Sequence, residues 1–117
     1  MIKIEKTVHD KKEASDGKRI LVMRFWPRGI SKDKVDVWIK ELGTDKELIK
    51  KWKTGKISWN NFSAEYEKGL KGREYLLKDL AKQAKEGTIT LLCSCKDMNH
   101  CHRYLLKIAI AEYIPRI

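Results

Sequence analysis

The chain lacks any apolar run that approaches the roughly 20 residues a membrane-spanning helix needs. Its first residues, MIKIEKTVHDKKE, also lack the apolar stretch of a secretory signal peptide. Glutamine is almost absent while lysine and glutamate are plentiful, which is a composition that leans toward a thermophile. We therefore expect a cytoplasmic protein without a membrane segment, folded as a single domain over residues 1–117.

Cysteine is scarce as well, and three residues are too few for the disulfide framework of a secreted protein. The odd count also leaves at least one thiol free. All three cysteines, with two of the three histidines, fall in the single segment CSCKDMNHCHR. In a reducing compartment such a cluster indicates metal, redox or nucleophile chemistry more often than a structural bridge.

Charge is present in excess, but it is not concentrated in one segment. The formal net charge is +10 and the isoelectric point about 9.6, yet no run of more than three basic residues occurs. A diffuse positive charge is typical of solvated lysine faces and gives at most non-specific affinity for phosphates. Nucleic-acid binding is therefore an alternative that the composition allows but does not favour.

Hydrophobic patterning predicts an α/β fold with a small, mainly parallel sheet and four to five helices. Strands are expected at about 2–8, 19–26 and 88–95, and the last of these is the clearest. Helical spacing and capping signals predict helices near 44–54, 58–68, 73–86 and 100–114.

Two segments in the middle of the chain carry local helix signals. The segment 31–42 carries Val35, Trp38, Ile39 and Leu42 at helical spacing, which favours a helix, although alternating β-branched residues there also fit a short strand. Thr44, followed three residues later by a glutamate, predicts the capping box of the next helix.

Both chemically unusual segments follow predicted strands directly. RFWPRG ends the strand at 19–26, and CSCKDMNHCHR ends the strand at 88–95. If these strands are parallel neighbours, the two segments meet at the carboxyl edge of the sheet, where open α/β sheets bind ligands.

The cysteine segment predicts a reactive thiol at Cys101. This residue stands at the start of the last predicted helix, whose positive end lowers the pKa of a nearby thiol, with Asp97 or Asn99 as the expected cap. His102 or His100 would be the base, and Cys95 would be a resolving thiol. Arg103 and Lys96 flank the thiols, and with the helix N–H groups they form a candidate anion site.

A metal site, with zinc as the candidate ion, uses the same segment. Its ligands would be Cys93, Cys95, Cys101 and either His100 or His102. The spacing counts against it, because alternate residues of a strand stand ~6–7 Å apart, whereas zinc needs sulfurs ~3.7–3.9 Å from each other. Since free cysteine is often simply buried, Cys93 also fits a plain core position.

The segment RFWPRG predicts a second half of the same site. Arg24 is a charge inside an apolar run and must emerge at the strand end or find a partner. Trp26 is rigid and apolar and would form a pocket wall. Arg28 sits where the chain turns, so its guanidinium and the following N–H groups can hold an anion.

The segment RILVMRFWPRGISKDKVDVWIKELG, then Trp52, then the pattern EGTITLL…KD…H resemble the YeaO-like family of small proteins, which is classed under a domain of unknown function. The resemblance spans nearly the whole chain and implies one small α/β domain, but it supplies no reaction. The C…CHR pattern that ends in Arg103 resembles a second branch of the same broad family. The family's signature positions are Arg24, Trp26, Pro27, Arg28, Gly29, Lys96, Asp97 and His100.

The leading hypothesis is therefore a protein that binds an anionic small molecule at the carboxyl edge of its sheet and acts on it as an enzyme or redox protein. No cofactor is required by this hypothesis. The alternatives are a metal-binding module built on the Cys/His cluster and a nucleic-acid-binding protein.

Overall fold

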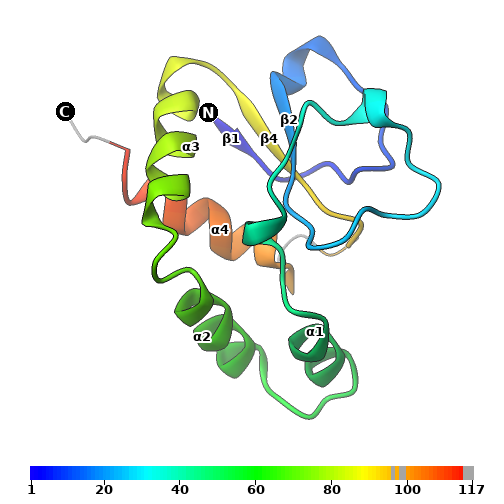
Figure 1. The fold of residues 1–117 in the computed structure, drawn as a ribbon, viewed down its shortest axis with the longest axis vertical. Coiled ribbons are helices and arrows are strands. Elements are labelled where there is room, and N and C mark those ends of the chain that lie inside the picture. The colour runs from blue at the N-terminus through cyan, green and yellow to red at the C-terminus, as the bar shows by residue number, and fades with distance from the viewer. Residues whose placement is uncertain (96, 98–99, 115–117) are drawn as a thin grey trace.

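Four short parallel strands form the sheet on which the chain is built (Figure 1). In the computed structural model, which describes residues 1–95, 97 and 100–114, the strand order is β1-β4-β2-β3. The bounds are Ile2–Lys3 for β1, Lys18–Leu21 for β2, Val37–Trp38 for β3 and Ile89–Leu92 for β4. All three strand pairs are parallel, which confirms the predicted α/β class.

Four α-helices lie within the described residues: α1 (Lys46–Lys53), α2 (Trp59–Gly69), α3 (Glu74–Glu86) and α4 (His102–Ala111). Short 3₁₀ turns occupy 14–16, 32–34 and 40–42. Helix α4 packs on α3 and α2, and α2 also contacts α1 (Figure 1). No helix in this described part of the chain is long and apolar enough to cross a bilayer.

The strands end earlier than the sequence predicts. The ranges 2–8, 19–26 and 88–95 shrink to ladders of two or four residues. Beyond the ladders, the described residues make isolated hydrogen bonds, such as that from the Val8 N–H to the Cys93 carbonyl and that from the Val22 N–H to the Leu92 carbonyl, both at 3.0 Å. The carboxyl edge of the sheet therefore opens into loops, and these loops carry the candidate site.

The predicted helix over 31–42 is wrong, and the strand alternative describes the chain better. Val37 of β3 pairs with Ile20 of β2, and the Ile39 N–H donates to the Leu21 carbonyl at 2.9 Å. The physical reason is the free edge of β2, which offers hydrogen bonds to a segment rich in β-branched residues. Long-range pairing thus overrides the local helical spacing.

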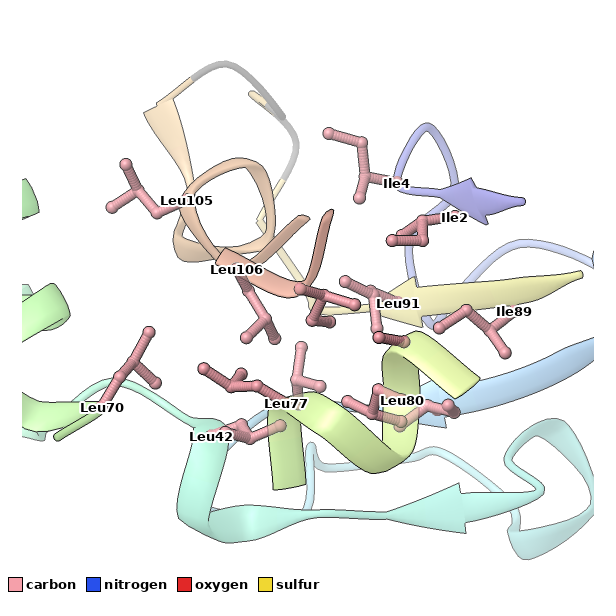
Figure 2. Close-up of a cluster of buried hydrophobic side chains, with 14 of the residues drawn as sticks. Ile2, Ile4, Leu42, Leu70, Leu77, Leu80, Ile89, Leu91, Leu105 and Leu106 are labelled. Atoms are coloured by element: carbon pink, nitrogen blue, oxygen red, sulfur yellow. The ribbon is translucent and has the colours of Figure 1, made fainter. Parts of the chain in front are cut away.

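The main hydrophobic core lies between the sheet and helices α2, α3 and α4 (Figure 2). Alternate strand residues such as Ile20 and Leu91 point to this core, while Leu21 and Leu92 point to a smaller cluster on the opposite face. This alternation follows from the two-residue period of a strand. Cys93 comes directly after β4 and, by parity, on the main-core side, where it is buried.

A buried ion pair fixes the loop between β1 and β2. Arg19 is fully buried, and its guanidinium donates to the Asp16 carboxylate at 2.7 Å and to the carbonyls of Lys34 and Asp10 at 2.7 and 3.0 Å. The Lys6 ammonium lies 2.9 Å from the same carboxylate. These contacts join the β1–β2 loop to the segment that leads into β3.

This ion pair predicts a specific loss of stability in acid. Burial alone would raise the pKa of Asp16, but hydrogen bonds from Lys6, the Glu13 backbone and Arg19 lower the pKa to about 2. A lowered pKa stabilises the fold above the ordinary pKa of aspartate, and the gain, about 2 kcal/mol, is lost as the pH falls from about 4 toward 2.

Asp16→Asn should therefore cost about 3 kcal/mol of unfolding free energy at pH 7, because the buried Arg19 loses its charged partner. It should also flatten the acid dependence. Urea unfolding followed by tryptophan fluorescence at pH 7, 4 and 2 measures both effects. Equal slopes for the variant and the wild type below pH 4 would contradict the assignment.

Candidate functional site

Two thiols and one imidazole meet where β4 ends and α4 begins. Cys93 follows β4, Cys101 is the N-cap residue of α4, and His102 is its first residue. The two sulfurs and one ring nitrogen lie within 4.8 Å of one another, and all three residues are buried. The predicted placement of Cys101 and His102 at a helix start is confirmed. Cys93 also lies beside Cys101, in addition to His102.

The hydrogen bonds of His102 fix its tautomer. Nε2 lies 2.5 Å from the Val22 carbonyl oxygen, which can only accept, so Nε2 carries the proton. In the neutral ring Nδ1 therefore holds the lone pair, and it lies 3.7 Å from Cys101 Sγ. His102 is therefore oriented by the backbone beyond β2 to accept a proton from the Cys101 thiol.

Arg103 lies behind the thiols and not in the open site. Its side chain is buried, with Nε donating to Cys101 Sγ at 3.4 Å and Nη2 to the Cys95 carbonyl at 2.6 Å. Nη1 donates to the Lys6 carbonyl. These hydrogen bonds let Arg103 position Cys101 and place a positive charge beside its sulfur. Because the donors are occupied, the geometry does not support a direct role for Arg103 in holding a ligand.

The thiol pKa values depart from the expectation that Cys101 is the acidic one. A hydrogen bond from Cys101 lowers the pKa of Cys93 to about 7, against the effect of burial. The same hydrogen bond, with burial, raises the pKa of Cys101 to about 11. Burial also raises the pKa of Cys95. The pair thus shares one proton near neutral pH, with the negative charge on Cys93.

A cavity of about 310 Å³ opens onto these thiols. Its cationic walls come from Arg24, Lys46 and Lys53, and no aspartate or glutamate among the described residues lines it. The other lining residues are members of the thiol segment, the polar Thr44 and apolar side chains: Cys93, Ser94, Cys95, His100, Cys101, His102, Thr44, Met23, Phe25, Ile49, Trp52 and Phe62. Apart from the Cys93 thiolate, the charges in this wall are positive, and such a set favours an anionic ligand.

His100 forms part of the cavity wall in an exposed position. Its Nδ1 lies 2.9 Å from an Asp97 carboxylate oxygen, and its ring stacks on Trp52 and meets the edge of Trp59. Asp97 also accepts from the His100 N–H at 3.3 Å, so it closes a turn. It is not the predicted cap of α4, since the N-cap is Cys101; Asn99 and Lys96 lie outside the described residues.

Cys95 lies in the same wall but outside the close cluster. It is half-buried, and its thiol lies 3.7 Å from the Asp97 carbonyl. Of the predicted metal ligands, Cys93, Cys101 and His102, the alternative to His100, come together, whereas Cys95 and His100 are not in the close group.

The segment RFWPRG is split between two places. Arg24 lines the thiol cavity, and its Nη2 donates to the Gly43 carbonyl at 3.2 Å. Trp26 points elsewhere: its Nε1 donates to the Ile30 carbonyl at 2.8 Å, and its ring meets Trp38 edge-on beside a separate open hollow. Arg28 is exposed and lines neither place. Of the three side chains predicted to bind a ligand in this segment, Arg24 alone lies beside the thiols, and its neighbour Phe25 also lines the cavity.

Sequence reasoning missed the contribution of α1. Thr44 was expected to cap this helix, but the cap is Asp45, whose carboxylate accepts from the Glu47 N–H at 3.2 Å. Thr44 is instead buried in the cavity wall. No local sequence pattern predicts that Thr44 lines the cavity, because this position depends on α1 lying against the carboxyl edge of the sheet.

Comparison with known proteins gives a consistent family. Residues 2–114 match the family described as DUF488-N3a, the active DUF488-N3 subclade. The chain is 40% identical over 103 residues to "Uncharacterized protein YeaO" of Escherichia coli (strain K12), covering 86% of this chain and 90% of that protein. It is 28% identical over 101 residues to "Uncharacterized protein Rv3073c" of Mycobacterium tuberculosis (strain ATCC 25618 / H37Rv), covering 85% of each chain.

A protein of Mycobacterium bovis, "Uncharacterized protein Mb3100c", matches equally well, at 28% identity over 101 residues. No solved structure is a significant match. The YeaO-like resemblance read from the sequence is therefore confirmed, and the chain belongs to the DUF488-N3a family.

Proposed function

We propose that the protein is a thiol-dependent enzyme that acts on an anionic small molecule. The observation that carries this proposal is a buried thiol pair with an oriented imidazole, opening into a cavity whose charged side chains beyond the thiols are all cationic. Nucleophile, base and ligand-binding charge are thus within one small volume. The family description supports an activity, because it calls the subclade active without naming a reaction.

The roles follow from the hydrogen bonds. Cys93 is the nucleophile, held as a thiolate by the Cys101 thiol, and Nδ1 of His102, 3.7 Å from Cys101 Sγ, accepts the one proton that the thiol pair loses when Cys93 ionises. Attack by the Cys93 sulfur on an electrophilic carbon forms an S–C bond, and the electron pair of the broken bond leaves with the displaced group. His100, oriented through Nδ1 by Asp97, is the proton donor for that group at the cavity rim.

The choice between alkylating reagents tests the proposal. Iodoacetate is anionic and iodoacetamide is neutral, and both alkylate thiolates. Relative to the urea-unfolded chain, the native protein should prefer iodoacetate about tenfold, because the cavity attracts anions. Arg24→Gln should reduce this preference. A native preference equal to that of the unfolded chain would remove the anion site from the account.

A zinc module is the second candidate, and one observation favours it. Cys93, Cys101 and Nδ1 of His102 form a three-ligand group, and the Val22 carbonyl orients the histidine as such ligands are usually oriented. The Arg103 Nε at 3.4 Å from Cys101 Sγ counts against it, since it places another positive charge beside the cation.

The two candidates separate in variants of single cysteines. If zinc is structural, Cys93→Ser and Cys101→Ser should each unfold the domain and release one equivalent of metal to a colorimetric chelator. If both variants melt near the wild-type temperature without metal release, the zinc module is ruled out. The enzyme proposal expects this second result.

Nucleic-acid binding remains a proposal that rests on the diffuse positive charge alone. It expects binding that weakens steeply with salt, because each contacted phosphate releases counterions. A flat salt dependence in a filter-binding titration would eliminate it.

A further inference from the structure

Two buried polar atoms in the wall of the thiol cavity have no hydrogen-bond partner among the described residues. They are Arg24 Nε and Thr44 Oγ1, and both residues line the cavity. Thr44 is only 4 % exposed, so water does not readily satisfy its hydroxyl. Buried polar groups are nearly always paired, and leaving one unpaired is costly, so two in one wall call for a ligand.

The chemistry of these atoms defines the ligand's polar end. Arg24 Nε can only donate, the Thr44 hydroxyl can donate, and the Lys46 ammonium at the start of α1 adds a third donor in the same wall. A group that accepts several hydrogen bonds and carries negative charge fits this set best. Carboxylates and phosphate monoesters are the two common sources of such an oxyanion.

The remaining wall defines the ligand's other end. Phe25 lines the cavity and is 62 % exposed, while Ile49, Trp52 and Phe62 continue the apolar surface inward. Covering a large exposed aromatic ring with an apolar group lowers the free energy. The volume of about 310 Å³ lies at the lower end of the range typical of small-molecule sites, so the ligand is small.

We propose that Arg24, Thr44 and Lys46 form an oxyanion subsite, and that the substrate is a small amphipathic acid whose apolar body packs on Phe25 and Trp52. The inference rests on the proposed function in one respect, since it places this substrate beside the thiols. The subsite itself does not require the thiols to react.

Four probes test it by isothermal titration calorimetry on the full chain. Phenyl phosphate and benzoate carry both the oxyanion and the apolar body, whereas inorganic phosphate lacks the body and benzyl alcohol lacks the charge. The inference expects at least one aryl anion to bind at least tenfold more tightly than inorganic phosphate and benzyl alcohol. Whichever aryl anion binds more tightly identifies phosphate or carboxylate as the natural group.

Thr44→Val is the central variant, because it keeps the shape of the side chain and removes only the hydroxyl. Since that hydroxyl has no partner, the variant should melt at or above the wild-type temperature yet bind the aryl anion about 10-fold to 100-fold more weakly. Thr44→Ser should keep the binding. Lys46→Gln should also weaken it, while Lys50→Gln, the same charge change on α1 outside the cavity, should not.

Unchanged affinity in both Thr44→Val and Lys46→Gln would overturn the subsite, as would equal affinity for all four probes. Lys46 is exposed, so its variant keeps the test decisive if the buried Thr44 variant fails to fold. Alkylation of the same wild-type preparation separates the two proposals. Reactive thiols without variant-sensitive binding overturn only the subsite, and variant-sensitive binding beside inert thiols overturns only the thiol enzyme.

Discussion

Replacing Cys101 by alanine should raise the pH midpoint of Cys93 alkylation by about two pH units. The Cys93 thiolate reacts, so the rate rises with pH and reaches half its plateau at the pKa, which lies at about 7 in the intact pair. The hydrogen bond from Cys101 is the main cause of that low value. Without it, burial and the ordinary acidity of a thiol place the midpoint near 9 or above.

Two other variants make this result specific. Cys101→Ser keeps a hydrogen-bond donor beside Cys93, so its midpoint should stay well below that of the alanine variant. Cys95→Ala removes a half-buried thiol of the same cavity that does not lower the pKa of Cys93, so the midpoint should not rise. Iodoacetamide pulses across pH 5–10, read by peptide mass spectrometry, give all four curves. A wild-type midpoint near 9 would contradict the shared thiolate.

Gly43→Ala should lower the free energy of unfolding by about 3 kcal/mol or more. A Cβ at Gly43 would lie 2.1 Å from the Arg24 backbone nitrogen and 2.6 Å from the Met23 carbonyl carbon. These atoms are backbone and cannot rotate away, so the chain leaving β2 must move. Because the Gly43 carbonyl also holds Arg24, the preference for iodoacetate should fall in the fraction that remains folded.

Gly69→Ala is the matched control. Gly69 is the last residue of α2, and nothing lies within 4 Å of the Cβ that alanine would add. The better helix propensity of alanine should leave the free energy of unfolding unchanged or up to about 1 kcal/mol higher. Urea titrations of both variants give the comparison, and similar stabilities for the two would show that the fold accommodates a Cβ at position 43.

The sequence predicts the parts of the fold that rest on local signals. The helices expected near 58–68 and 73–86 and the strand expected at 88–95 are present: Ser58 caps α2 by accepting from the Asn61 N–H at 3.1 Å, Gly87 follows the end of α3, and β4 lies within 88–95. Each of these depends on a few neighbouring residues. The segment 31–42 was misassigned because the partner that makes it a strand, β2, is distant in sequence.

The candidate site divides in the same way. Adjacency in sequence reveals Cys101, His102 and the helix start, and strand order places Arg24 at the same edge of the sheet. That Thr44 and Lys46 line the cavity, and Trp26 and Arg28 do not, was not predictable, because it depends on the path of the chain after RFWPRG. The acidity of Cys93 also needs the Cys101 contact, which no spacing rule supplies.

One measurement tests the central claim most directly: native and denatured mass spectra of untagged protein, purified without chelator and pulsed briefly with iodoacetamide at pH 7. The account predicts a native mass without metal and one carbamidomethyl group, mapped to Cys93, added faster than in the unfolded chain. A native excess of one zinc ion that is lost on denaturation, with the thiols unmodified, would contradict it and make the Cys/His cluster a metal centre.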